Sequence, residues 1–149
     1  MRDQPRRRGV RRISVTDPIA VARPHDYADA FELALDEPDR YSPEEWVRAG
    51  FDGLPAWFKW ITGAGDGLGS FRIVESDDDV VVLEDSDSLM DAVMVGRLVE
   101  PKRRVLTSIM RFRRPLLTRV VWTFVGPVHR RIARRMVAAG LHHAGQGDS

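Results

Sequence analysis

Apolar residues near the C-terminus recur at steps of one, three and four positions, which is the spacing of one face of a helix. The stripe consists of Leu116, Leu117, Val120, Val121, Phe124, Val125, Val128, Ile132 and Met136. It predicts a helix over residues 115–143, kinked at Pro127 because proline donates no hydrogen bond to the preceding turn. We expect the stripe to lie on the core, so that an aspartate at Val121 or Phe124 would prevent folding.

Strict alternation of apolar and small or polar residues marks residues 26–35. One parity holds Tyr27, Asp29, Phe31, Leu33 and Leu35. This pattern predicts a strand with one buried face. Asp29 stands on the apolar side, and a carboxylate buried there needs a partner.

Two short helices are expected after this strand. Ser42 suits the N-cap and Pro43 the first helical position of one helix, which would end near residue 51. The second helix is predicted over residues 55–62. It would bring together two tryptophans, Trp57 and Trp60.

Four strands follow a glycine-rich connector over residues 63–69. The connector has a helix before it and a strand after it, which is the reverse of a phosphate-binding loop. The predicted strands cover residues 70–75, 80–84, 89–99 and 104–113. One face of the third carries Met90, Ala92, Met94, Gly96 and Leu98. One face of the fourth carries Leu106, Ser108, Met110 and Phe112. Small residues and methionines there indicate either the close approach of a helix or an adaptable hollow.

The order of these elements predicts an α+β fold in which a curved antiparallel sheet wraps a long C-terminal helix, the helix-grip arrangement. The two short helices come after the first strand. A chain of 149 residues is of single-domain length. We place that domain at residues 16–144, between a disordered basic tail over residues 1–15 and a disordered tail over residues 145–149.

Charge is distributed unevenly, although the net charge is only +1. Residues 1–12 hold six arginines and one acid, and residues 101–147 hold eleven lysines or arginines and no acid. Residues 66–91 hold nine acids and one arginine. Complementary faces within the fold or a solvated surface explain such blocks most simply. The alternative is that the basic blocks form a surface that binds nucleic acid or an anionic membrane.

The composition also limits the possible cellular location and the possible chemistry of the protein. The chain has no cysteine, which excludes disulfides, thiolate metal sites and a cysteine nucleophile. The N-terminal arginines are not followed by the ~7–15 apolar residues of a secretory signal. The longest uncharged apolar stretch, residues 120–128, is shorter than the ~20 residues of a membrane span. A cytoplasmic protein without a transmembrane span is therefore expected.

No metal or cofactor site is expected from the motifs. The aspartates of residues 77–79 and 85–87 lack the glycine and terminal glutamate of a calcium loop. His142 and His143 are adjacent, so they cannot share a helix face. No serine occupies a Gly-x-Ser-x-Gly elbow.

Asp29 is the strongest polar candidate for a functional residue. It is either a structural carboxylate, which caps backbone N–H groups or pairs with an arginine (Arg119 is the expected partner), or an acid that orients a ligand or acts as a general base. His129, beside the expected kink, is either a hydrogen-bonded structural residue, which is the favoured interpretation, or a base or metal ligand.

A pocket between sheet and helix would need apolar walls and one or two polar groups, such as Asp29, Tyr27 or Ser108. The candidate ligand-binding residues are Tyr27, Asp29, Phe31, Trp57, Trp60, Met90, Met94, Met110 and Trp122.

Four short motifs carry a resemblance to a known family. They are Asp26-Tyr27-Ala28-Asp29-Ala30-Phe31, Ser42-Pro43-Glu44-Glu45 leading to Phe51, Leu54-Pro55-Ala56-Trp57, and Pro127-Val128-His129-Arg130-Arg131-Ile132. On these motifs, which cover most of residues 25–144, the chain resembles uncharacterised bacterial proteins of the START-like (SRPBCC) superfamily, the domain-of-unknown-function family numbered 2867. The resemblance implies a helix-grip fold that holds hydrophobic small molecules between sheet and helix. It implies no defined reaction.

Three functions remain as hypotheses. The favoured one is a module that binds an apolar small molecule. The second is a cyclase or dehydratase on the same scaffold, using Asp29 with Tyr27 or His129. The third is a membrane-surface or partner-binding protein whose basic face comprises Arg130, Arg131, Arg134 and Arg135.

Overall fold

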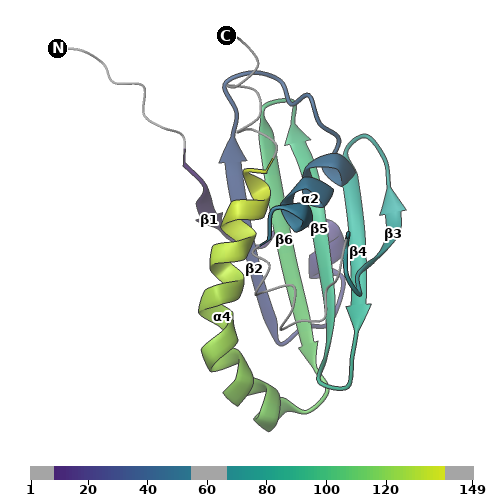
Figure 1. Cartoon of the computed structure of the whole chain (residues 1–149), viewed down its shortest axis with the longest axis vertical. Helices are drawn as coiled ribbons and strands as arrows, with labels where there is room; N and C mark the ends of the chain where they lie inside the picture. Colours follow the sequence, from purple (N-terminus) through teal and green to yellow (C-terminus); the bar gives the residue numbers. More distant parts are fainter. Residues whose placement is uncertain (1–8, 55–66, 140–149) are drawn as a thin grey trace, which may run out of the picture.

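A computed structural model describes residues 9–54 and 67–139 of the chain. Within these residues, six strands form one antiparallel sheet in the order β1-β2-β6-β5-β4-β3 (Figure 1). The strands are β1 (Arg11–Ile13), β2 (Tyr27–Ala34), β3 (Arg72–Ser76), β4 (Val80–Ser86), β5 (Met90–Glu100) and β6 (Arg103–Phe112). An open antiparallel sheet with a long C-terminal helix confirms the α+β class expected from the sequence.

Some predicted features fall outside the described part of the chain. The helix expected over residues 55–62 is among them, together with the candidate site residues Trp57 and Trp60. At the other end, a disordered tail is predicted over residues 1–15, whereas Arg11–Ile13 form β1 and pair with β2. The segment has no alternating apolar pattern, because its strand is a short edge strand that buries little.

The helices lie on both faces of the sheet. In Figure 1, α2 (Pro43–Asp52) and α4 (Pro115–Val137) lie in front of the strands, and the single-turn α1 (Pro18–Val21) lies behind them. The main core fills the space under α2 and α4. It includes Phe31, Leu33, Trp46, Val47, Phe51, Leu83, Met94, Leu106, Ala133 and Met136. A smaller cluster of Val80, Val82 and Val95 lies on the other face, against Ile19 of α1.

The start of α2 follows its sequence signals. Ser42 is the N-cap, and its hydroxyl accepts a hydrogen bond from the backbone N–H of Glu45 at 3.3 Å. Pro43 occupies the first helical position, where its missing N–H costs nothing. This confirms the predicted helix start.

Glycine lets α2 lie close to the sheet. A Cβ added at Gly96 of β5 would come within 2.9 Å of Val47 Cγ2 and 3.2 Å of Trp46 Cη2. Of the two interpretations of the small residues on this strand, the close approach of a helix is therefore correct at Gly96.

The first half of the long helix turns a different face to the core from the one that its apolar stripe predicts, whereas near the C-terminal end Met136 of the stripe is buried in the core and Ile132 packs against it. Its inward residues are Thr118, Trp122, Gly126, His129, Ala133, Met136 and Val137, which are buried or half-buried. In contrast, Leu116 and Phe124 are 85% and 76% exposed. The expectation that Phe124 lies in the core is wrong, because the inward positions of this part of the helix include Thr118 and Gly126, which carry no apolar signal. The helix continues through Pro127.

A buried arginine joins three parts of the fold. Arg104 of β6 is 0% exposed and forms a two-pronged ion pair with Asp39, which lies between β2 and α2. Its Nη1 also donates hydrogen bonds to the backbone carbonyls of Val137 and Ala139, at 3.3 and 2.7 Å. The guanidinium thereby satisfies carbonyls at the C-terminal end of α4.

No helix in residues 9–54 and 67–139 is long and apolar enough to cross a membrane.

Candidate functional site: a buried polar cluster beneath α4

Five side chains that carry polar atoms meet between the sheet and the middle of α4. Tyr27 and Asp29 lie on β2, and Ser108 lies opposite Asp29 in the β2–β6 register. Trp122 and His129 come from the inward face of α4. Alternation in β2 places Tyr27 and Asp29 on one face, and the seven-residue spacing of Trp122 and His129 is two helical turns.

Asp29 is the centre of the cluster. Its side chain has no exposed surface, and its Oδ2 accepts a hydrogen bond from the Tyr27 hydroxyl at 2.7 Å. His129 Nε2 lies 3.3 Å from the same oxygen but is not aligned for a hydrogen bond. Among the described residues no arginine pairs with Asp29, so the expected Arg119 contact is wrong and His129 takes that place. Arg119 is exposed instead.

Three further polar atoms of the cluster are buried without a hydrogen bond to any described residue. They are the second carboxylate oxygen of Asp29, the hydroxyl of Ser108 and the indole nitrogen of Trp122. A buried polar group left unpaired costs about 1–3 kcal/mol, and native proteins keep few of them. Both Asp29 and Ser108 are only 1% exposed. The cluster can therefore offer an acceptor, a donor and a hydroxyl to a bound molecule.

The aromatic rings of the cluster lie close to one another. The Tyr27 and Trp122 ring centroids are 4.8 Å apart, and those of Trp122 and His129 are 5.3 Å apart. Phe112 lies at 6.4 Å from Trp122 on the sheet side. Such rings hold one another in place and present flat apolar surfaces.

The environment of Tyr27 favours its neutral form. Burial raises the pKa of Tyr27 above its ordinary value of 10.0, and the hydrogen bond to Asp29 raises this pKa further. Arg130 lowers the Tyr27 pKa by a smaller amount. The hydroxyl therefore remains a proton donor to Asp29 at neutral pH.

The structure brings together only part of the predicted site. Tyr27, Asp29 and Trp122 are in the cluster, and Met110 pairs with Tyr27 in the strand register. Phe31 and Met94 belong to the main hydrophobic core. Met90 is half-buried at the start of β5, opposite Phe112.

Ser108 and His129 also enter the cluster; the sequence predicts Ser108 as a polar group of the pocket and His129 as a candidate base, although neither is among the candidate ligand-binding residues. The alternation of the last strand and the helical step from Trp122 to His129 were the signals for them. The proximity of Arg130 to Tyr27 has no signal in the sequence.

A concavity lies beside Asp91 on β5, near the end of the sheet where α4 begins. It is a groove of about 600 Å³ whose walls include Arg23, Glu84, Asp91 and Arg113. Arg23 pairs with Glu84 at 2.5 Å, and Arg113 pairs with Asp91 at 2.7 Å. Because these charges already satisfy one another, the groove is the weaker candidate.

Metal binding finds no support in the described part of the chain, where no group of three or more histidines and acids could hold an ion. No protein-family model matches the chain, and no curated protein or solved structure matches it significantly.

Proposed function

We propose that this protein binds a small molecule with an apolar body and one polar group, held between the sheet and α4 at the Asp29 cluster. The observation that carries the proposal is the buried carboxylate of Asp29, one of whose oxygens has no hydrogen-bond partner among the described residues. A ligand that donates a hydrogen bond to this oxygen would offset the cost of burying it.

The cluster favours a particular ligand chemistry. A hydroxyl or amide N–H would donate to Asp29, and an oxygen of the same ligand would accept from the Trp122 indole. Ser108 can donate or accept. The ring of Trp122 and the side chains of Met110 and Phe112 would contact the apolar body.

The resemblance of the sequence motifs to the START-like superfamily supports the same proposal. A sheet with a long C-terminal helix over one face is the coarse arrangement of the helix-grip fold, and membership of the START-like superfamily is part of our proposal. A cytoplasmic location is also proposed, on the sequence grounds given above.

The first test is native mass spectrometry of the protein purified gently from its own host, followed by denaturing extraction. We expect a stoichiometric organic adduct with an apolar body. Asp29→Asn should lose the adduct, because the amide can no longer accept two charge-assisted hydrogen bonds.

Glu32→Gln is the matched control, since it changes a carboxylate on the opposite face of the same strand. It should retain the adduct. Loss of the adduct from both variants, or from neither, would contradict the role of Asp29.

One observation favours a second function, general acid–base catalysis. A carboxylate oxygen that lies near both a histidine ring and a tyrosine hydroxyl is an arrangement that moves protons in enzymes. In a cyclase or dehydratase, His129 would exchange the proton while Asp29 orients the ring.

This alternative predicts a split between binding and turnover. The extracted molecule, returned to the apo-protein, should be converted by the wild type and not by His129→Gln, although both bind it. If the wild type binds the molecule without converting it, catalysis is excluded and only the binding function is supported.

A further inference from the structure

The outer face of α4 is apolar along its first half. Within that half, Leu116, Leu117, Val120, Phe124 and Val125 are 85%, 49%, 60%, 76% and 41% exposed. Steps of four connect Leu116, Val120 and Phe124, so these three lie along one line on the helix. We call these five residues the α4 patch. Single exposed apolar residues are common, but a contiguous set of large ones marks a contact surface.

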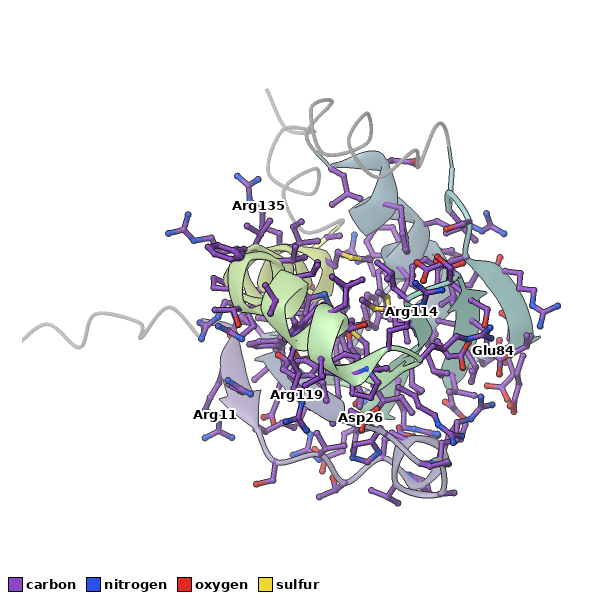
Figure 2. All side chains as sticks on the ribbon, turned by 90° about the horizontal axis from the view of Figure 1, so that it is seen from below. Arg11, Asp26, Glu84, Arg114, Arg119 and Arg135 are labelled. Carbon is purple, nitrogen blue, oxygen red and sulfur yellow. The ribbon has the colours of Figure 1, made fainter. Side chains whose placement is uncertain are left out.

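The same line of the helix becomes basic in its second half. After Phe124 it passes Pro127 and reaches Arg131 and Arg135, all of them exposed. Arg114 and Arg119 stand at the other end. Figure 2 views the molecule from the end at which α4 begins, with Arg114 and Arg119 labelled near that end and Arg135 farther along the helix.

These arginines have no acidic counterpart close by. Residues 101–147 contain no aspartate or glutamate. Within the described residues, no ion pair involves Arg114, Arg119, Arg131 or Arg135. Their charge is therefore available to an external anion.

The combination fits one kind of surface. An anionic bilayer accepts apolar side chains at the boundary of headgroups and acyl chains, and its phosphates attract arginines along the same helix. The contact between two copies of the patch would bury the apolar side chains but leave the flanking arginines uncompensated. We propose that α4 docks on an anionic lipid membrane, with the α4 patch inserted and Arg131 and Arg135 on the headgroups.

The test is flotation of the full chain with vesicles. We expect binding to equimolar phosphatidylcholine and phosphatidylglycerol, much weaker binding to phosphatidylcholine alone, and a steep loss of binding as salt is added. Phe124→Ser should weaken binding roughly tenfold, from the apolar area lost to the membrane. The triple change Leu116→Ser, Val120→Ser and Phe124→Ser should weaken it on the order of a hundredfold or more.

Charge variants test the second half of the surface. Arg131→Gln and Arg135→Gln should each lower the affinity for anionic vesicles roughly fivefold. The control for the apolar changes is Val74→Ser with Val99→Ser, two exposed valines on strands away from α4. The control for the charge changes is Arg40→Gln, another exposed arginine. Neither control should change binding, and circular dichroism should show that every variant is folded.

Four results of the vesicle and light-scattering experiments would overturn the proposal. They are no binding of the wild type to anionic vesicles, equal binding to neutral ones, binding that the triple change leaves intact, and a wild-type dimer that the triple change converts to a monomer in light scattering. The last would assign the patch to a second copy of the chain. Duplex DNA is included in the assay, and a preference for DNA over vesicles with the same variant sensitivity would equally exclude the membrane.

Discussion

Arg104 forms its ion pair with Asp39 in the interior of the protein, where the two side chains are 0% and 1% exposed. The guanidinium also lies 5.3 Å from the Trp46 ring centroid and 5.9 Å from that of Tyr41. The pair thus connects β6, the segment before α2 and the C-terminal end of α4. Arginine suits this place better than lysine, because its planar group can make two hydrogen bonds to a carboxylate and still stack on rings.

Removing either partner of the Arg104–Asp39 ion pair should destabilise the folded protein. Asp39→Asn or Arg104→Met should each lower the free energy of unfolding by about 3–5 kcal/mol, because one partner loses its compensation in the interior. Urea unfolding followed by circular dichroism measures the change. Arg40→Gln, which removes an exposed ion pair with Glu37, should cost less than about 1 kcal/mol. Equal effects for Arg104 and Arg40 would contradict the burial of the pair.

The orientation of α4 makes a prediction opposite to that of its apolar stripe. Phe124→Asp should fold and change stability by no more than about 0.5 kcal/mol, since the side chain is 76% exposed. Ala133→Asp should prevent stable folding, because Ala133 is 2% exposed and a charge there would lack a partner. Thermal melting of both variants decides between the two faces. If Phe124→Asp unfolds and Ala133→Asp does not, the helix is rotated from the arrangement described above.

The raised pKa of Tyr27 links stability to alkaline pH. In the unfolded chain the phenol ionises near its ordinary pKa of 10.0, whereas in the folded protein burial delays ionisation to higher pH. The stabilising contribution of neutral Tyr27 is thus fully present below pH 10 and is lost as pH rises through the folded-state pKa. The stability difference between wild type and Tyr27→Phe should therefore become less favourable to the wild type above pH 10.

Two measurements check this pH dependence. Unfolding experiments at several alkaline pH values give the difference in stability directly. In a Tyr41→Phe background, Tyr27 is the one remaining tyrosine, and phenolate absorbance should report its ionisation above pH 10. Ionisation at or below pH 10 would contradict the burial of the hydroxyl.

Gly96 sets the distance between β5 and α2. In Gly96→Ala the new Cβ would lie 2.9 Å from Val47 Cγ2 and 3.0 Å from Val81 Cγ1, so stability should fall by about 1–3 kcal/mol. Gly53→Ala is the comparison, because its nearest neighbour would be 3.4 Å away and its φ is −80°. That variant should be neutral or slightly stabilising. Urea unfolding of the two variants should separate them.

Local sequence patterns predict the strands and the start of α2, because residues close in the sequence determine these features. Alternation in β2 places Asp29, Phe31 and Leu33 on the buried face, and the Ser42 hydroxyl caps α2 as its position indicates. The turn between β3 and β4 likewise depends on neighbouring residues, since the Asp77 carboxylate accepts hydrogen bonds from the backbone N–H groups of Asp79 and Val80.

Tertiary pairing is what the sequence does not reveal. In its first half, the face of α4 that meets the sheet carries Thr118 and Gly126, and no hydrophobicity pattern identifies these positions, whereas Met136 of the apolar stripe is buried as its pattern indicates. Likewise, nothing near Asp29 in the sequence indicates that His129 will be its neighbour, because the contact joins residues a hundred positions apart. Arg104 stands in a basic run, and only the fold shows that it is buried.

The open sheet ends, in the described part of the chain, at two edges of unequal kind. One edge, β1, is only three residues long and begins with two arginines. The other, β3, has an irregular register between Ile73 and Glu75. A short charged edge and an irregular one are both poor templates for an incoming strand. At high concentration, copies of the protein should therefore resist stacking edge to edge into fibrils.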